Sequence, residues 1–305
     1  MSQAKEENRG RIQQWAKDSM QDPEGTYRGL FYLVTVFFLL TTLFPFYWLL
    51  VLALTPRSEI TDMGLLPKGF NPEVFVTIFE RLPFHVYMFN SFVLALVTTV
   101  IVLVLASLAG YVFGRLDFPG RGGLMLLILA ISYFPPAAFL IPLFRLFTGN
   151  IEILGLNSPM LFNTPGALLL PFSALFMPLS IFILTTFYGQ IPDGLEDAAR
   201  IEGTTRLGAL FRVIMPLSAP GVATAGVLTF INVYNEFFFS FLMTDGQAKN
   251  WAPIVWGILG YQGQYSASYN LMAAASIVGV LPIAILVVVA QEKIVSGLTA
   301  GALKE

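Results

Sequence analysis

The chain has 305 residues, of which 56% are hydrophobic and only 12% carry a charge, and its formal net charge is −2. Soluble domains carry about a quarter charged residues, so this composition cannot cover a water-facing surface and indicates a membrane protein. The small negative charge excludes nucleic acid as a partner. With no cysteine and a single histidine, His85, we expect no disulfide, no thiolate chemistry and no metal site.

The N-terminal residues 1–28 are polar and charged, and the apolar run that follows them is too long for the core of a cleaved signal peptide. We therefore expect residues 1–28 to be a cytoplasmic tail and residues 29–305 to form one membrane domain. Within the tail, Ile12, Trp15, Ala16 and Ser19 share one helical face. That pattern is typical of a short interfacial helix, and a disordered tail is the alternative.

Six apolar segments are long enough to cross a bilayer, which takes roughly 20 mostly apolar residues. The sequence therefore predicts an all-α polytopic protein with transmembrane helices at Leu30–Leu54, Val86–Phe113, Leu124–Phe147, Ala167–Tyr188, Gly221–Met243 and Leu271–Gln291. Prolines inside these segments remove backbone donors. We expect a kink in the third span, at Pro135 and Pro136, and further kinks at Pro45, Pro171, Pro178 and Pro282.

Basic residues set the orientation, because the cytoplasmic loops of membrane proteins are enriched in lysine and arginine. If the N-terminus is cytoplasmic, the inner segments hold most of these residues. The outer segments hold only Arg57, Lys68, Arg81, Arg145 and Lys249. We expect both termini inside, with long outer connections at Thr55–His85 and Asp245–Asn270.

The inner connection between the fourth and fifth spans, Gly189–Pro220, is far longer than a simple turn. Asp193 and Glu196 have the spacing of a capping box at the start of a short helix, and Gly203 can end that helix in a left-handed conformation. Thr204 or Thr205 can start a second helix. The sequence predicts a rigid helical hairpin, with thin Ala198 and Ala199 flanked by the polar Glu196, Asp197 and Arg200, which suits docking to a partner.

The stretch LEDAARIEGTTRLGALFRVIMPLSAPG, which contains this hairpin, resembles the EAA loop of binding-protein-dependent ABC importer permeases. The family pattern is E-A-A, three residues, G, nine residues and I-x-L-P. It falls on Asp197, Ala198, Ala199, Gly203, Val213, Met215 and Pro216. Asp for Glu, Val for Ile and Met for Leu are departures of similar chemistry, and Glu196 stands beside Asp197. An ordinary amphipathic connector is the alternative interpretation.

Further stretches extend the resemblance over nearly the whole chain. GYVFGRLDFPGR, FINVYNEFFFSFLM and KIVSGLTAGALK are similar to carbohydrate permeases of the maltose (MalG-like) branch. The resemblance implies the type I ABC importer fold and a multi-pass protein of the prokaryotic cell membrane. It also implies four kinds of partner: a second, related permease, two cytoplasmic ATPase subunits, an external solute-binding protein and a sugar.

The chain lacks the means to hydrolyse ATP. A P-loop requires a lysine directly after a glycine, and no lysine here follows one. No catalytic serine–histidine–aspartate set is credible with His85 near the outer end of a span. We expect no enzyme activity and no cofactor in this chain, with ATP and magnesium bound by the partner ATPases.

The fifth span carries the polar residues that we consider for a solute path. Thr229, Asn232 and Glu236 recur at a helical spacing, with Asn235 beside them and Tyr234 and Phe237 as adjacent aromatic planes. Glu236 lies about 16 residues beyond Pro220, roughly 24 Å along a helix, in the outer part of the membrane. A subunit-interface bond or a gate element is the structural alternative.

These features favour a permease subunit that moves a sugar or oligosaccharide by alternating access. A permease for another small polar solute remains an alternative. A self-contained secondary transporter or channel is a further one, but it leaves the long inner hairpin without a purpose. The spans also lack the paired buried charges typical of ion coupling.

Overall fold

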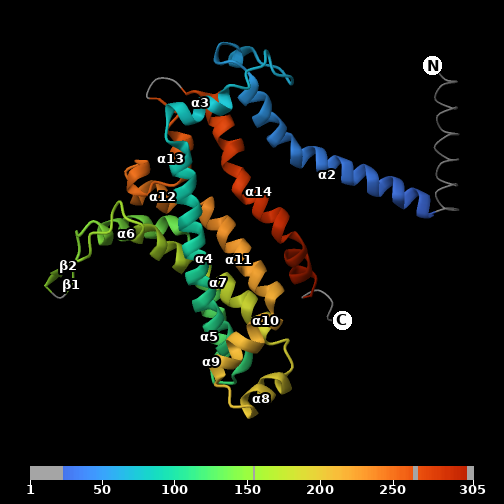
Figure 1. The fold of residues 1–305 in the computed structure, drawn as a ribbon, viewed down its shortest axis with the longest axis vertical. Helices are drawn as coiled ribbons and strands as arrows, with labels where there is room; N and C mark the ends of the chain where they lie inside the picture. The colour runs from blue at the N-terminus through green and yellow to red at the C-terminus, as the bar shows by residue number, and fades with distance from the viewer. Residues whose placement is uncertain (1–22, 154, 264–266, 301–305) are drawn as a thin grey trace, which may run out of the picture.

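The computed structural model describes residues 23–300 except 154 and 264–266. Four helices in this part of the chain are long and apolar enough to cross a membrane, and two bent helix pairs raise the possible number of spans to six. The predicted tail helix around Ile12 lies outside the described residues. The long helices run between an end that carries η1 and α3 and an opposite end that carries α8 (Figure 1).

The helices follow one another along the chain with short connections. The long helices are α2 (Pro23–Leu54), α4 (Phe84–Arg115), α7 (Gly166–Tyr188), α11 (Ala219–Tyr234) and α14 (Tyr269–Ala300). The shorter ones are η1 (Arg57–Asp62), α3 (Val74–Arg81), α5 (Arg121–Ser132), η2 (Pro136–Phe139), α6 (Leu140–Phe147), α8 (Asp193–Ile201), α9 (Arg206–Ala209), the π-helical turn η3 (Leu210–Ile214), α10 (Met215–Leu217), α12 (Phe238–Met243), η4 (Ala248–Asn250) and α13 (Ile254–Leu259).

The only strands among the described residues form a small antiparallel hairpin outside the bundle. β1 (Glu152–Ile153) pairs with β2 (Leu156–Asn157) in the loop that follows α6. The all-helical prediction therefore holds for the membrane bundle, and the hairpin is the one exception in the described part of the chain.

Two predicted spans are interrupted. The third is broken rather than kinked, with an 83° bend between Arg121–Ser132 and Pro136–Phe147. Pro135 and Pro136, at this break, have no N–H to continue the helical bonding. The fifth span was predicted to be continuous to Met243, which is wrong: α11 ends at Tyr234 and α12 begins at Phe238. By contrast, Pro45, Pro171, Pro178 and Pro282 lie inside unbroken helices.

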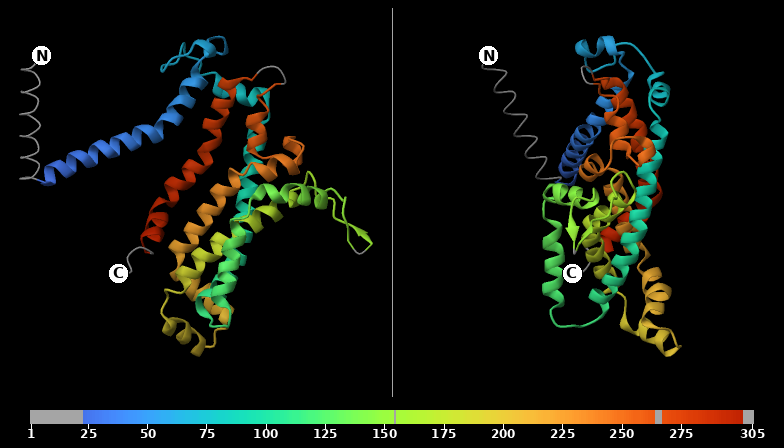
Figure 2. Two further views of the ribbon diagram at one scale, coloured as in Figure 1. Left: turned by 180° about the vertical axis from the view of Figure 1, so that it is seen from behind. Right: turned by 90° about the vertical axis from the view of Figure 1, so that its left-hand side faces the viewer.

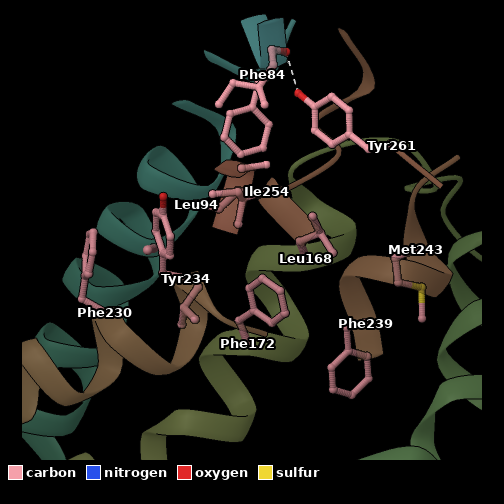
Figure 3. Close-up of a cluster of buried hydrophobic side chains, with 14 of the residues drawn as sticks. Phe84, Leu94, Leu168, Phe172, Phe230, Tyr234, Phe239, Met243, Ile254 and Tyr261 are labelled. Carbon is pink, nitrogen blue, oxygen red and sulfur yellow. Dashed lines mark hydrogen bonds between the residues drawn. The ribbon is translucent and has the colours of Figure 1, made fainter. Parts of the chain in front are cut away.

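The bundle core lies where α4, α7, α11 and α14 meet. In its outer half, Phe84, Leu168, Phe172 and Met243 are almost fully buried. They pack with aromatic side chains from α11 and α12, with Ile254 of α13 and with Tyr261 (Figure 3). The two buried tyrosine hydroxyls of this core are hydrogen-bonded. Tyr261 donates to the carbonyl of Ile78 at 2.6 Å, and Tyr234 donates to the carbonyl of Gly279 at 2.9 Å. Burial with a satisfied hydrogen bond avoids the cost of an unpaired polar group.

The helix α2 leaves this bundle along much of its length (Figures 1 and 2). Large apolar side chains from Tyr27 to Phe46 are exposed on it, and only 11% of its most apolar window is buried. An exposed apolar surface of this size requires lipid or another subunit to cover it.

The helices α4 and α7 pack closely at the end of the bundle that carries the hairpin. A Cβ added at Gly110 would lie 2.9 Å from the Cβ of Leu184, and one at Gly114 would lie 3.0 Å from the carbonyl oxygen of Thr185. The pair Gly110 and Gly114 thus forms a small-xxx-small contact of the kind that lets membrane helices pack closely.

We predict that Gly110→Val destabilises the protein by about 1–3 kcal/mol, because the added side chain overpacks the contact with α7. The measurement is the thermal midpoint of the detergent-purified protein, followed by size-exclusion chromatography. Gly122→Val is the matched control, since nothing lies within 4 Å of a Cβ at Gly122. Equal midpoints for the two variants would contradict the close α4–α7 contact.

Candidate functional site

The inner connection folds into the predicted helical hairpin. α8 ends at Ile201, and Gly203 adopts a φ of 90°, in the left-handed region expected of it. The N–H of Gly203 donates to the carbonyl of Arg200 and that of Thr204 to the carbonyl of Ala199, both at 3.0 Å, which closes the helix end. Thr205 then caps α9, with its hydroxyl accepting from the Gly208 N–H at 3.1 Å.

The predicted capping box at the start of α8 is wrong. Pro192 is the N-cap residue and no side chain caps this helix end. Asp193 and Glu196 instead bind a cation on another element, Arg115, which is the last residue of α4. The two carboxylates share a partner that the sequence prediction did not name, and it comes from about eighty residues earlier in the chain.

Arg115 and Glu196 form a buried ion pair that fastens α8 to the inner end of α4. The Arg115 side chain is 5% exposed and that of Glu196 is 10% exposed, with 2.9 Å between Nε and Oε2. Asp193 lies 3.0 Å from the same guanidinium on its solvent side. Arg115 also donates to the carbonyl of Ile191, and the Tyr111 hydroxyl donates to Oε1 of Glu196 at 2.5 Å. We call the set Tyr111, Arg115 and Glu196 the anchor.

The hydrogen bonds of the anchor keep the Glu196 carboxylate ionised. Burial by itself would raise the pKa of Glu196, but the hydrogen bonds from Tyr111 and Arg115 and the positive charge of Arg115 outweigh it and lower the pKa below its ordinary value. Glu196 therefore stays ionised at neutral pH. A buried ion pair with satisfied hydrogen bonds tolerates neither the loss of one partner nor a change in geometry.

Apolar packing fixes the second leg of the hairpin to the bundle. Ala209, Leu210 and Ile214 are fully buried, and the last two belong to one cluster with side chains of α4, α7 and α11. Within this cluster the Tyr188 hydroxyl donates to the Ser107 hydroxyl at 3.0 Å. The hairpin is thus joined to the bundle by an ion pair on one leg and by a hydrophobic core on the other.

The face of the hairpin that points away from the bundle is largely exposed in the described chain. Asp197, Ala198 and Gly203 are exposed and Ala199 is half-buried. Asp197 and Arg200 form only a loose, solvent-exposed pair at 4.0 Å. Pro216 is exposed on α10, at the base of the second leg. Of the docking residues proposed from the sequence, Glu196 alone is turned inward, away from any partner.

The sequence reasoning missed three residues that shape this site. Ile201 is 87% exposed at the tip of the hairpin, a large apolar side chain with no neighbour to cover it. Arg115 and Tyr111 belong to the anchor. A signal for Arg115 existed, because a basic residue at the inner end of a span needs a counter-charge when it is buried, and α8 carries two carboxylates in its first turn.

The polar residues of the fifth span do not form one continuous face, because α11 ends at Tyr234. Thr229 is buried and shares a 3.1 Å hydrogen bond with Ser180 of α7. Glu236 is buried and accepts from the N–H groups of Phe239 and Ser240 at 3.1 Å, and from the Ser240 hydroxyl, so it binds the first turn of α12. Asn232 and Asn235 remain exposed, each donating only to a carbonyl one turn earlier.

This arrangement defines a class of protein: a bundle of membrane-spanning helices with an anchored helical hairpin at its inner end, whose surface is exposed. The comparisons with known proteins identify the class further. The chain belongs to the family described as binding-protein-dependent transport system inner membrane component, whose model matches residues 102–299. It is a multi-pass cell-membrane protein and the permease subunit of an ABC importer.

Three relatives are similar over almost their whole length. The chain is 38% identical to the sulfoquinovosyl glycerol transport system permease protein SmoH of Agrobacterium fabrum, over 87% of this chain and 90% of that one. It is 36% identical to the trehalose permease SugB of Mycobacterium tuberculosis, over 86% and 92%. It is 34% identical to the trehalose/maltose permease MalG of Thermococcus litoralis, over 86% and 91%.

A solved structure shares the fold. A chain of a bacterial ABC transporter that imports the acidic polysaccharide alginate superimposes with a TM-score of 0.70, at 17% identity, over 89% of this chain and 97% of that one. A second structure of such a transporter, in complex with a pentasaccharide-bound periplasmic protein, gives 0.66 at 16% identity, over 90% and 94%. The fold is therefore that of the type I ABC importer permeases.

We predict that Arg115→Gln releases α8 from α4, because Glu196 is left as a buried charge without its cation, at a cost of about 3–5 kcal/mol. Hydrogen exchange of α8 amides in the purified protein should accelerate while that of α7 stays unchanged. Arg121→Gln is the matched control, because its pair with Asp117 is solvent-exposed and contributes little.

The double variant Arg115→Gln with Glu196→Gln should recover part of the α8 protection, since it leaves no uncompensated buried charge. Unchanged exchange of α8 in Arg115→Gln would show that the apolar leg alone holds the hairpin.

Proposed function

We propose that this chain is one of two related permease subunits of a sugar importer driven by two cytoplasmic ATPase subunits. The observation that carries the proposal is the uncovered face of the anchored hairpin, with Ala198 and Ile201 exposed on a helix that is fixed to α4. Residues 29–305 act as the permease domain, residues 1–28 as a cytoplasmic tail, and residues 189–220 as the coupling segment. ATP and magnesium belong to the partner subunits.

The hairpin is suited to transmit force because it is stiff and attached at two points. A partner that binds Ala198, Ala199 and Ile201 and then moves would displace α8. Because the anchor holds α8 to α4, α4 would move with it. The buried residues Leu210 and Ile214 pass it to α7 and α11. Since α4, α7 and α11 form the bundle core, movement of the hairpin reorients the spans together, as alternating access between inward-open and outward-open states requires.

A sugar or oligosaccharide is the substrate class that we propose. The named relatives transport sulfoquinovosyl glycerol, trehalose and maltose, and the structural relatives import alginate. An external solute-binding protein would deliver the sugar, as the family name and the periplasmic protein bound to one structural relative suggest. Another small polar solute is the alternative substrate. A self-contained channel or secondary transporter is disfavoured, because a protein that works without an ATPase has no use for an exposed, anchored cytoplasmic hairpin.

The exposed amides of α11 are the chain's proposed contribution to the solute path. Asn232 and Asn235 use one amide hydrogen each within the helix and keep a free carbonyl and a second hydrogen. The exposed ring of Phe237 follows directly and stacks on Phe241 with centroids 5.4 Å apart. Amides beside an aromatic plane match the hydroxyls and the apolar faces of a sugar. Thr229, Tyr234 and Glu236 support this segment from inside the bundle.

The docking surface can be tested by cross-linking. The natural chain has no cysteine, so a single engineered cysteine at Ala198 can be labelled with a thiol-reactive, photoactivatable cross-linker. On irradiation it should form an adduct with the ATPase subunit in a transport-competent complex. A cysteine at Asp117 is the matched control, because Asp117 is also exposed at the inner end of the bundle but lies outside the hairpin. Absence of an adduct at Ala198, or equal adducts at both sites, would contradict docking through the hairpin.

Transport assays separate the two roles along the fifth span. Asn232→Ala should raise the solute concentration needed for half-maximal uptake, or lower uptake, by roughly fivefold, the value of a hydrogen bond, with normal assembly of the complex. Glu236→Gln should instead reduce the yield of folded complex, because it weakens the bonds that start α12. Normal uptake by assembled Asn232→Ala would remove α11 from the solute path.

A further inference from the structure

A polar hollow lies at the outer end of the molecule, opposite the coupling hairpin. Its volume is about 260 Å³ and it is formed where η1, α3 and the start of α14 meet. It is lined by Arg57, Asn71, Glu73, Val74, Thr77, Arg81, Ser268, Asn270 and Leu271. Nothing in the transport mechanism described above uses these residues.

The two arginines of the hollow form no ion pair within the described part of the chain. Among the residues that the structure describes, neither Arg57 nor Arg81 makes an ion pair or a side-chain hydrogen bond. Glu73 is the one carboxylate in the lining, so the hollow carries an excess of positive charge. The nearby Lys68 differs, because it is already paired with Asp62. Two free guanidinium groups around one hollow form a natural receptor for a carboxylate.

Asn270 gives a second, independent indication of a ligand. It is 7% exposed, and its Oδ1 is buried with no hydrogen-bond partner among the described residues. A buried amide oxygen without a donor is costly. The site thus offers guanidinium donors from its arginines and an unpaired amide oxygen from Asn270. A carboxylate ion can pair only with the guanidinium donors, whereas an acidic residue can pair with both through its side chain and a backbone N–H.

The size and lining of the hollow argue against a sugar. Small-molecule sites generally occupy about 300–1,000 Å³, and no aromatic side chain lines this one. The exposed amides of α11, with aromatic rings beside them, fit a sugar better. A protruding side chain from another protein matches the smaller volume.

We propose that this hollow, lined by Arg57, Arg81 and Asn270, receives an acidic side chain from the solute-binding protein when it docks on the outer face of the permease. This rests on the proposed function, because it assumes a binding protein. The contact is a charge-assisted bond at the rim of an interface. Such bonds fix the register of docking and speed association, and their strength depends on salt.

The test uses the assembled transporter in lipid nanodiscs and the purified binding protein that supports its uptake. Arg57→Gln with Arg81→Gln should raise the Kd for the binding protein about tenfold at low salt, and should flatten the rise of Kd with added salt. Both arginines are exposed, so folding should be preserved. Arg145→Gln is the matched control, since Arg145 is an exposed cation on α6, outside the hollow, and its Kd should equal that of the natural protein.

Charge exchange identifies the acidic partner. Arg81→Glu should weaken docking further, and replacing the partner acid of the binding protein by lysine should restore it. An unchanged Kd in the double glutamine variant overturns the proposal. Loss of sugar binding to the transporter without loss of docking also overturns it and assigns the hollow to the solute. If the natural complex neither docks a binding protein nor imports sugar, the proposed function itself fails, which is a separate result.

Discussion

The buried pair between Arg115 and Glu196 is the constraint on which the working of this molecule depends. Without this pair, α8 would be joined to the bundle only through its connecting segments. A force applied to α8 would then move those segments instead of α4. With the pair, the first leg of the hairpin is held to α4 by an ion pair at 2.9 Å, supported by the Tyr111 hydroxyl. The pair adds little to net stability, because desolvation offsets the attraction. The pair instead fixes the geometry, because two oppositely charged groups that are shielded from water strongly favour a single relative position.

Close packing between α4 and α7 extends this constraint into the membrane. Gly110 and Gly114, which directly precede Tyr111 and Arg115 in the chain, bring the α7 backbone against α4. The same two helices, with α11, receive the apolar leg of the hairpin through Leu210 and Ile214. The hairpin, α4, α7 and α11 therefore behave as one body at the inner end. One break, the 85° bend at Ser218, separates the second leg of the hairpin from α11 within this body. The other breaks lie at Pro135 in the third span and between Tyr234 and Phe238.

The two ends of the bundle differ in how they treat charge. At the inner end the basic residue that closes α4 is neutralised by the chain's own carboxylates, which leaves alanine and isoleucine as the surface for a partner. At the outer end Arg57 and Arg81 stay unpaired around a hollow. Under the proposed function, an apolar inner surface suits an ATPase that stays bound. Charges at the outer end suit a binding protein that associates and dissociates in every cycle, because they give fast and reversible association.

The sequence by itself determined the class of the protein, the positions of its first, second, fourth and sixth spans within a few residues, and the hairpin with its left-handed Gly203 and a threonine start at Thr204 or Thr205. These features follow from local composition and local bonding. It could not show the direction of Glu196. The spacing of Asp193 and Glu196 fits a capping box, and only the approach of α4, some eighty residues earlier, made Arg115 the better partner. The end of α11 was missed for a different reason: hydropathy runs on to Met243, whereas Glu236 accepts hydrogen bonds locally from the N–H groups of Phe239 and Ser240 at the start of α12. Local patterns report what a segment can form, and contacts between distant segments decide which of those possibilities has the lower free energy.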